Sequence, residues 1–451
     1  MSENAGFPKV LIVSQAAWDD STNFGSTFSN FFSNWDRKRI AHIYTEPSVP
    51  NTQCCETFFN ISEKTVFSST FRKGTPTGLA VQSMTHMDLD THVYDNSERK
   101  AVEFVKTHVN IQIISWVREL LWGLGKWKSA ELDRFLQEFE PDIVFLTFGT
   151  TFFINRIQRY IINQCKKPAV VMYTSDDGYT LKQFSLSPLY WIDRLAKRRT
   201  VRGTLDLVHT LYVISSEQLE EYNAIFDQKC KLLYKSADFS GQKGYKRSDD
   251  GIIKMVYTGN INLNRWKSLA RIGQVIERAN GDERRAELVI YSHTRYTKRI
   301  KNRFEKIPSI NFRGGVSHNE VSGIQEDADI LVHCEALGLK NYLRVRLSFS
   351  TKIVDYLSHH RCIFAVGRKE CASIRYFLKN DAAVVATSEC EIGEKLIVLL
   401  NDKTMIEEYA RKAWECGKRN HQMGVIQRSL YKDLRTLAQE VGKRVVNSTN
   451  P

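Results

Sequence analysis

The sequence predicts an α/β protein with two domains, each built on a buried parallel sheet. A chain of 451 residues is too long for one ordinary core, and its 42% apolar content can fill two. Short β-branched runs such as residues 9–14 and 252–257 are typical of strands covered on both faces. Between residues 236 and 251 the apolar pattern is lost, and a second series of strands and helices then begins. We therefore predict two facing Rossmann-like domains at 1–236 and 252–424, a linker at 237–251 and a C-terminal helix at 425–451.

The composition indicates an anionic partner. A formal net charge of +13 suits a nucleotide diphosphate, a lipid diphosphate or an anionic membrane surface. No nucleic-acid-binding module is recognisable, so nucleic acid is not an expected partner. The nine cysteines form no CxxC pair, and we expect neither a disulfide framework nor a metal site. Without an apolar leader or a membrane-spanning apolar run, the protein is expected to be cytoplasmic.

A polar loop at residues 19–27 follows the first predicted strand. It contains one glycine, Gly25, and hydroxyl residues that can cap a helix predicted at 28–35. The pattern fits a tight turn before a capped helix as well as a loop over a ligand. Residues 39–45 predict a second strand, whereas residues 46–105 show no clear period and are long enough to hold acceptor-binding loops.

Two stretches combine aromatic with basic residues. Residues 111–128 carry Trp116, Trp122 and Trp127 with basic residues between them, which is typical of a helix at a membrane interface. A helix that packs on the domain core explains the same pattern and is the commoner case. Residues 189–202 place an aromatic patch before a basic cluster, which indicates contact with anionic lipid or a lipid-linked acceptor. A solvated helix face is the alternative there.

Two adjacent carboxylates follow a buried strand predicted at 169–173, at the edge where open α/β sheets bind ligands. Asp176 and Asp177 are therefore candidates to act as a base toward an acceptor hydroxyl or to orient it. An Asp-Gly turn explains the same residues. Asp327 and Asp329 have the spacing of a metal-binding pair, but they directly precede a strand, and we interpret them as a helix-to-strand turn.

The first strand of the second domain leads into a loop suited to phosphate binding. Gly259, beside Asn260, lets a ligand approach the backbone, and Arg265 can neutralise a diphosphate or the charge on a departing nucleotide. A capped helix whose basic residues face water is the alternative. Arg295, after the next predicted strand, is a further candidate for donor binding, whereas the nearby His293 is more simply a structural histidine.

Residues 348–357 carry the clearest functional signal. Ser350 and Thr351 precede Lys352 at the start of a predicted helix, where free backbone N–H groups and the helix dipole favour an anion. Asp355 falls about one turn later on the same face. A cation for phosphates beside a carboxylate for sugar hydroxyls indicates a nucleotide-sugar site.

This segment resembles the donor-binding segment of GT-B glycosyltransferases, in particular the family 4-like enzymes of bacterial surface polysaccharide synthesis. The resemblance implies that Arg265 and Lys352 hold the diphosphate and that Asp355 binds the ribose. It also implies that the loop at 313–316, with Arg313 and Val316, holds the nucleotide base. The loop around Gly25 is then expected over the cleft, and the C-terminal helix is expected to cross back to the first domain.

The chain departs from that family at two places. Leu347 stands where the family has the first glutamate of a spaced pair, and Glu335 is the nearest upstream acidic residue that can contact the sugar instead. Family members often carry a histidine after the strand that corresponds to residues 142–147, but Phe148 and Gly149 follow it here.

The expected function is transfer of a sugar from a nucleotide-diphosphate sugar to a saccharide or lipid-linked saccharide, in cell-surface polysaccharide synthesis. Arg265, Lys352 and Glu335 are the expected catalytic residues. The resemblance implies retention of configuration and no metal, and no cofactor is expected. The net charge and the two aromatic and basic stretches favour a peripheral position on the inner face of the cell membrane. A sugar-nucleotide epimerase of the same shape and a non-catalytic partner of another transferase are the alternatives.

Overall fold

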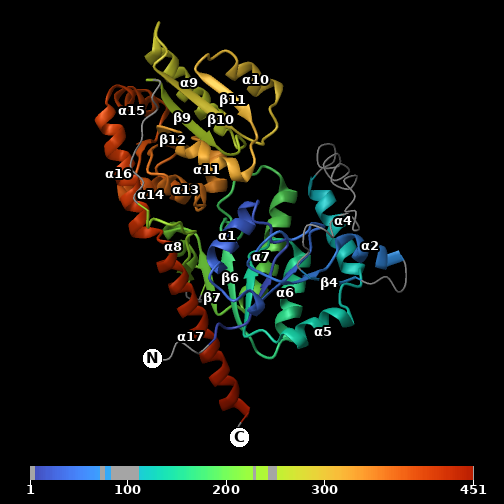
Figure 1. Ribbon diagram of the computed structural model, residues 1–451. Helices are drawn as coiled ribbons and strands as arrows, with labels where there is room; N and C mark the ends of the chain where they lie inside the picture. The colour runs from blue at the N-terminus through green and yellow to red at the C-terminus, as the bar shows by residue number, and fades with distance from the viewer. Residues whose placement is uncertain (1–5, 72–76, 83–110, 227–229, 242–250, 450–451) are drawn as a thin grey trace.

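The computed structural model describes residues 6–71, 77–82, 111–226, 230–241 and 251–449. Two sheets form its centre, one in each half of the chain, with helices packed around them (Figure 1). The predicted α/β architecture of two facing halves is confirmed. The first sheet ends at Leu232 and the second begins at Ile253, on either side of the predicted linker. The proposed limits of the two domains stay a prediction.

The first sheet has eight strands in the order β4-β3-β2-β1-β5-β6-β7-β8, and all neighbours are parallel except β3 and β4. Strands β1, β2 and β6 are buried along their whole length, as their apolar sequences predict. The strands are β1 (Val10–Val13), β2 (Ile40–Tyr44), β3 (Thr57–Asn60), β4 (Leu79–Gln82), β5 (Ile143–Thr147), β6 (Ala169–Thr174), β7 (Thr210–Val213) and β8 (Cys230–Leu232).

Several helices around this sheet begin at residues whose side chains cap free backbone N–H groups. Ser129 caps α5 by accepting a hydrogen bond from Leu132 N, and Ser187 caps α7 by accepting one from Tyr190 N. The helices are α1 (Asn23–Phe32), α2 (Glu63–Phe71), α4 (Ile111–Leu124), α5 (Ala130–Phe139), α6 (Phe152–Gln164), α7 (Pro188–Leu205) and α8 (Ser216–Asn223).

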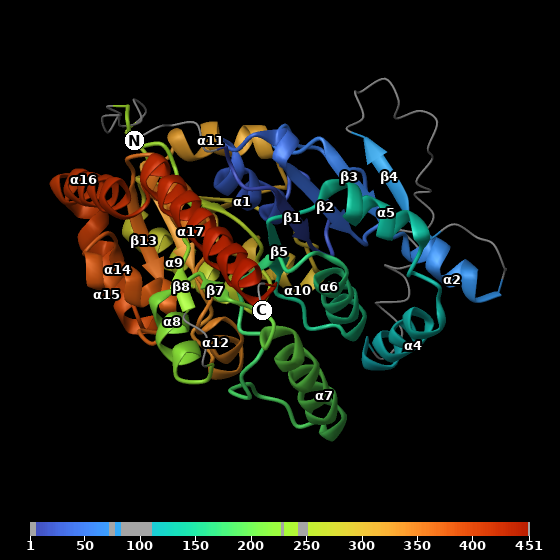
Figure 2. The same ribbon diagram turned by 90° about the horizontal axis from the view of Figure 1, so that it is seen from below.

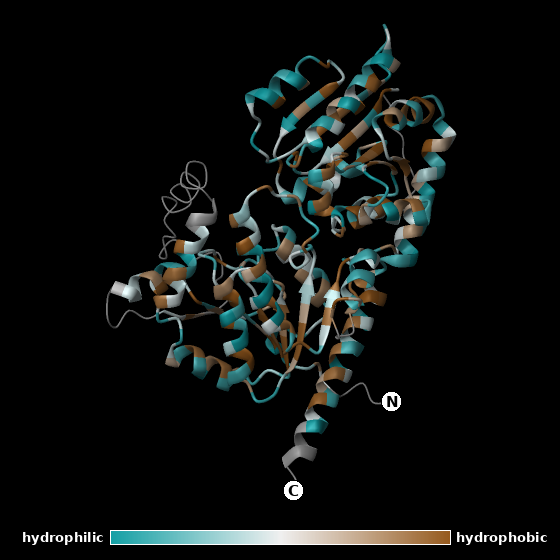
Figure 3. Ribbon diagram, turned by 180° about the vertical axis from the view of Figure 1, so that it is seen from behind, coloured by the Kyte–Doolittle hydropathy of each residue, from teal (hydrophilic) through white to brown (hydrophobic). Residues whose placement is uncertain are grey.

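The second sheet has six strands in the order β11-β10-β9-β12-β13-β14, all parallel. Its strands are β9 (Ile253–Thr258), β10 (Ala286–Tyr291), β11 (Ile310–Gly314), β12 (Ile330–Cys334), β13 (Cys362–Val366) and β14 (Val384–Ala386). Its helices are α9 (Arg265–Asn280), α10 (Lys298–Phe304), α11 (His318–Glu326), α12 (Leu339–Val345), α13 (Lys352–Ser358), α14 (Ala372–Asn380), α15 (Glu389–Asn401) and α16 (Lys403–Asn420). In Figure 3 the strands of both sheets are coloured mainly as hydrophobic, as expected for sheets with helices on their faces.

The last helix, α17 (Met423–Thr449), crosses from the second half back to the first (Figure 2). Gln427 Nε2 donates to the carbonyl oxygen of Asn30 at 2.7 Å, and Lys231 pairs with Asp433 at 2.8 Å. Beside it, Ala237 N donates to the carbonyl oxygen of His421 at 2.9 Å, so the two chain crossings between the halves lie together. The predicted returning helix is confirmed.

Two predictions about the first half were wrong or incomplete. Helix α1 begins at Asn23, five residues before the predicted start, because Thr22 caps it by accepting a hydrogen bond from Gly25 N at 3.0 Å. Residues 46–105 had no predicted order, but they contain β3, α2 and β4, whereas residues 83–105 lie outside the described residues. Within the described ranges, no helix is long and apolar enough to span a bilayer.

Candidate active site

A cavity of about 610 Å³ lies between the two halves, at the carboxyl ends of strands from both sheets. The first half contributes Ser14 after β1, Thr147 at the end of β5 and Asp176 after β6. The second half contributes Thr258 at the end of β9 and Glu335 after β12. Loops converge at this edge of open α/β sheets, which is where such sheets bind ligands.

Two cations and a carboxylate meet in the second half of this cavity. Arg265, the first residue of α9, donates from Nε and Nη2 to Glu335 Oε2 at 3.0 and 2.7 Å. Its Nη1 donates to Asn260 Oδ1 at 2.7 Å. The Arg265 and Glu335 side chains are only 14% and 7% exposed. Lys352 lines the same wall, and its Nζ lies 3.0 Å from where a Cβ on Gly259 would be, so glycine leaves room for the ammonium.

Burial shapes the charges of this cluster. Loss of solvent and the neighbouring Arg265 guanidinium lower the pKa of Lys352, against the opposite effect of Glu335. Burial raises the pKa of Glu335, and the two cations oppose that rise. The wall therefore holds more positive than negative charge in poor contact with water. An entering diphosphate would be stabilised by both cations.

His333, at the end of β12, faces the same cavity and was missed from the sequence. Its side chain is buried, and Nε2 lies 3.8 Å from Glu335 Oε1 without a hydrogen-bond partner among the described residues. Burial, together with the charges of Arg265 and Lys352, lowers the pKa of His333 to about 3, so the ring is neutral at physiological pH. A neutral imidazole with a free nitrogen can exchange a hydrogen bond with a sugar hydroxyl. The residue lies within an otherwise apolar strand, so the sequence pattern did not indicate its role.

The loop at 348–351 joins the two walls at the entrance to α13. Ser348 Oγ donates to Asp176 Oδ1 of the first half at 2.6 Å. Ser348, Ser350 and Thr351 line the cavity together with Lys352. The predicted donor contact of Ser350 and Thr351 stays a prediction. Thr258 N donates to Tyr356 Oη at 3.3 Å, which holds α13 against the end of β9.

Asp355 is placed differently from Lys352. Its Oδ1 accepts a hydrogen bond from Lys235 Nζ at 2.7 Å, and it is not among the residues that line the cavity. Lys235 follows the last strand of the first sheet, so the ion pair ties the linker region to α13. A ribose contact would require this ion pair to open, and that role stays a prediction.

Four other predicted donor residues are also absent from the residues that line the cavity: Gly259, Arg295, Arg313 and Val316. Arg295 and Arg313 are exposed, and the carbonyl oxygen of Val316 lies 2.8 Å from His293 Nε2. A Cβ on Gly315 would lie 2.1 Å from His293 Nδ1, so the histidine packs on the loop backbone, in agreement with its structural interpretation. The base-binding role of residues 313–316 stays a prediction.

On the first half, Asp176 lines the cavity whereas Asp177 does not. Gly25 lies within α1, where a Cβ would be 1.9 Å from the carbonyl oxygen of Asp19, so close packing explains this glycine. Its neighbours Asn23 and Phe24 do line the cavity. The segment therefore reaches the cleft as expected, but through residues other than Gly25.

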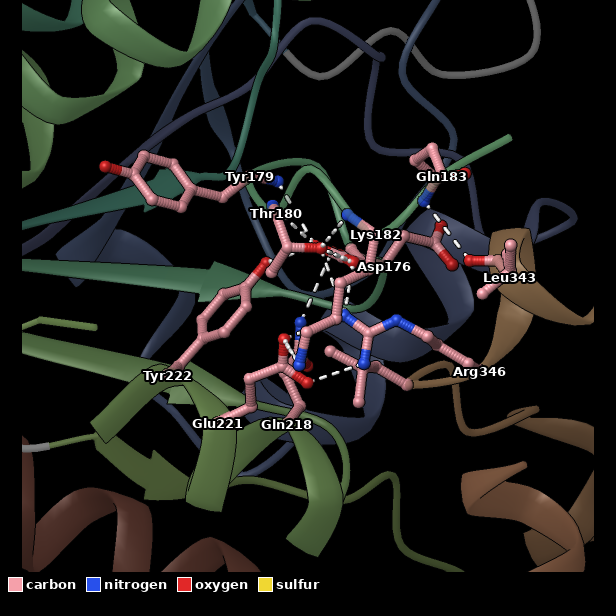
Figure 4. A network of polar contacts seen from close by, with 12 residues as sticks. Asp176, Tyr179, Thr180, Lys182, Gln183, Gln218, Glu221, Tyr222, Leu343 and Arg346 are labelled. Atoms are coloured by element: carbon pink, nitrogen blue, oxygen red, sulfur yellow. Dashed lines mark hydrogen bonds and ion pairs between the residues drawn. The ribbon is translucent and has the colours of Figure 1, made fainter. Parts of the chain in front are cut away.

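Asp177 belongs to a largely buried ion-pair network that joins the halves. Figure 4 shows Arg346 and Glu221 of this network. Arg346, just after α12, donates from Nη2 to Asp177 Oδ2 at 2.9 Å and to Glu221 Oε1 at 2.9 Å. Gln183 Nε2 adds a bond to the carbonyl oxygen of Leu343 at 3.2 Å. The position of Asp177 indicates a structural role, so the predicted acceptor role rests on Asp176 alone. Sequence reasoning missed Arg346 because its partners lie more than a hundred residues away.

No three His, Cys, Asp or Glu side chains converge as metal ligands in the part of the chain that the structure describes. Asp329 Oδ2 accepts a hydrogen bond from Lys254 N at 2.8 Å, which agrees with the interpretation of residues 327–329 as a turn.

The two facing sheets, the returning α17 and the interfacial cavity define the GT-B fold, and the chain's structural neighbours are glycosyltransferases with this fold. Anabaena HepE (Alr3699), in complex with UDP and glucose, matches with a TM-score of 0.60 and 10% identity, over 95% of this chain and 100% of that one. Sucrose-phosphate synthase from Thermosynechococcus elongatus matches with a TM-score of 0.60 and 9% identity, over 95% and 98% of the two chains.

The α,α-trehalose 6-phosphate synthase from Burkholderia multivorans has a TM-score of 0.59 and 9% identity, over 97% of this chain and 98% of that one. At these identities the likeness establishes the fold. A scan against protein-family models and a search of curated sequences found no match. The narrower resemblance to family 4 stays a prediction.

Proposed function

We propose that the protein is a glycosyltransferase that moves a hexosyl group from a nucleoside diphosphate sugar to a hydroxyl of a saccharide acceptor. The observation that carries this proposal is the pair of poorly solvated cations, Arg265 and Lys352, beside Glu335 in a cavity between two facing sheets. Structural neighbours support it, since HepE has been seen with UDP and with UDP-glucose.

The reaction follows from the distribution of charge. The bond between the anomeric carbon and the diphosphate oxygen breaks, and its electrons stay on that oxygen, where Arg265 and Lys352 stabilise them. The acceptor oxygen forms the new bond, and its proton passes to the departing diphosphate. Asp176, on the opposite wall, orients the acceptor hydroxyl.

Glu335 has a second task in this scheme. Both hydrogen bonds that Arg265 donates to Glu335 reach Oε2, so Oε1 can accept a hydrogen bond from a sugar hydroxyl. An entering phosphate would share the Arg265 guanidinium with Glu335. His333 supplies a further hydrogen bond at the same place.

The finer parts of the proposal are retention of configuration, independence of metal ions and a lipid-linked saccharide as acceptor in surface polysaccharide synthesis. The two cations can neutralise the leaving diphosphate themselves, so we expect EDTA to leave the rate unchanged. Retention follows from the family resemblance and is tested by the anomeric proton signal of the first product formed.

Donor binding is tested by a thermal-shift screen of UDP-, GDP- and TDP-sugars on the wild type and on Lys352→Ala. One sugar nucleotide should raise the melting temperature of the wild type. The variant should lose that shift and all transfer while remaining folded, because removal of the half-buried Lys352 ammonium also removes its repulsion of Arg265. Lys340→Ala, which removes an exposed lysine of α12, is the matched control and should behave as wild type.

Three outcomes would overturn the proposal. Normal turnover by Lys352→Ala would contradict the assignment of the donor site. Conversion of the donor alone into an epimer would identify a sugar-nucleotide epimerase. No shift with any nucleotide sugar would favour a non-catalytic partner of another transferase.

A further inference from the structure

Apolar side chains gather on the outside of the first half, beside the opening of the cleft. More than half of the large apolar side chains that the described residues leave exposed come from α4 and from residues 181–195. Leu186 is 88% exposed, Leu120 62% and Ile192 58%. Soluble surfaces carry such residues singly, so a concentration on two neighbouring segments indicates an interaction surface.

The two segments form one surface. Trp116 Nε1 of α4 donates to Asp193 Oδ1 of α7 at 3.0 Å, and Lys197 Nζ pairs with the other oxygen of Asp193 at 2.8 Å. Figure 2 shows α4 and α7 as neighbours at the same side of the molecule. We call the exposed side of α4, the segment 181–187 and α7 the α4–α7 surface.

Each helix is held by one face and leaves an apolar stripe outside. Trp122 of α4 is fully buried and stacks on Phe153 with ring centroids 4.5 Å apart. Trp116, Leu120 and Leu124 are exposed at intervals of four residues, which places them on one face of the helix. The sequence offered an interfacial helix or a core-packed helix. The structure packs one face of α4 on the core and leaves apolar side chains exposed on the other, and the interfacial role stays a prediction.

Positive charge borders the apolar stripe. Arg199 is exposed and lies one turn after Leu195 and two turns after Ile192, on the same face of α7. Exposed Lys126 and Lys128 directly follow α4. Apolar residues with interleaved cations suit an anionic bilayer, where rings and aliphatic chains enter the headgroup region and cations meet lipid phosphates.

The surface is continuous with the cavity. Gly178 lines the cavity, and the chain reaches exposed Leu181 three residues later. Gln183 is hydrogen-bonded to the second half at Leu343, so the start of the segment lies beside the junction of the two halves. A bilayer held at this surface would bring membrane-anchored molecules to the mouth of the cleft.

We propose that the α4–α7 surface docks the protein on an anionic lipid bilayer and so presents the cleft to an acceptor anchored in that bilayer. Docking itself stands on the surface alone, whereas the choice of acceptor rests on the proposed transferase function. A second copy of the chain fits the surface less well, because the cations would face each other and the formal net charge is +13.

The test is sedimentation of the full chain with vesicles of phosphatidylcholine alone and of phosphatidylcholine with phosphatidylglycerol. The wild type should bind the mixed vesicles. The triple variant Leu120→Ser, Leu186→Ser and Ile192→Ser should lose at least about tenfold of that binding, because apolar insertion supplies much of the affinity. Its melting temperature should be unchanged, since all three side chains are exposed.

A matched triple variant removes exposed apolar side chains from the second half, Leu339→Ser, Leu378→Ser and Val398→Ser, and should bind like the wild type. Arg199→Glu should weaken binding to the mixed vesicles only. Absence of wild-type binding, or equal binding by the first triple variant, overturns the proposal.

Two further measurements separate other occupants of the surface. A dimer in light scattering that the first triple variant converts to a monomer, without vesicle binding, would make the surface an interface between copies and overturn the proposal. A photo-crosslinker at position 186 that captures residues 83–110 instead of lipid would show that the chain covers this surface itself, and would overturn the proposal. Because vesicle binding needs no nucleotide, its loss is distinguishable from a failure of the transferase function in the thermal-shift screen.

Discussion

The two walls of the cavity differ in chemistry. The second half presents Arg265, Glu335, Lys352 and the neutral His333, all buried or nearly so. The first half presents mostly neutral hydroxyl, amide and aromatic side chains, with Asp176 as its carboxylate. The charged residues of the second half suit a charged ligand. The residues of the first half suit a neutral saccharide, since hydroxyls exchange hydrogen bonds with sugars and aromatic rings cover their apolar faces. This difference supports the proposal that the donor binds to the second half and the acceptor to the first.

The Arg346 ion pairs that join the two halves are more buried than the ion pairs on the rest of the surface. Arg346 binds Asp177 and Glu221 across the junction with its side chain only 8% exposed, whereas surface pairs such as Lys166 with Glu140 lie open to solvent. Buried charges stabilise an arrangement strongly only while every partner is present. The contact between the halves therefore depends on a few residues. Substitutions in the two walls and in their junction test this comparison.

Removal of the guanidinium from the charged wall should have the largest effect. Arg265→Met leaves Glu335 buried and unpaired, which should cost about 3–5 kcal/mol of unfolding free energy. The double variant with Glu335→Gln should recover most of that stability but not donor binding. Chemical denaturation and the donor-induced thermal shift measure the two properties. A single variant as stable as wild type would contradict the ion pair described above.

Loss of the junction network should have the next largest effect. Arg346→Met should lower the free energy of unfolding by about 2–3 kcal/mol, because hydrogen bonds to buried carboxylates are lost. The loss is limited because Thr180 still donates to Asp177 and Lys182 still pairs with Glu221. Lys166→Met, in an exposed ion pair, is the control and should leave the denaturant midpoint unchanged. Equal effects of the two substitutions would show that the network does not hold the halves together.

Donor binding should depend on pH through Lys352. The folded protein lowers the pKa of this lysine, so its ammonium is lost at a lower pH than in an exposed lysine. Since the diphosphate binds the charged form, affinity should be constant at lower pH and fall by about tenfold per pH unit above that pKa. Lys352→Arg keeps its charge and should flatten the profile. Isothermal titration calorimetry across alkaline pH measures both, and identical profiles would contradict the assignment.

The smallest expected effect concerns the sugar rather than the nucleotide. His333→Phe removes the free Nε2 but keeps an aromatic ring, and should weaken nucleotide-sugar binding about fivefold, the worth of one hydrogen bond of about 1 kcal/mol. Binding of the nucleoside diphosphate alone should not change. If both ligands weakened equally, the histidine would act on the phosphate end or on folding instead.

Strand periodicity, the break near residue 240 and the restart at Ile252 are local properties, and they were enough to predict two α/β halves. Lys352 and Arg265 could be selected for the same reason, because a cation at the start of a helix is visible in a short window of sequence. The returning helix was predicted from its length and the family resemblance, and contacts with α1 confirm it.

Only the tertiary structure decided which side chains meet. Asp177 pairs with Arg346 and leaves the cavity, Asp355 pairs with Lys235, and His333 turns from an apparent core residue into a cavity residue. Such pairings join residues that are distant in the chain, and they depend on how two sheets face each other. The local sequence pattern determined which segments form helices and strands. Packing between the two halves decided which charges pair, because a buried charge is stable only where a partner from another part of the chain reaches it.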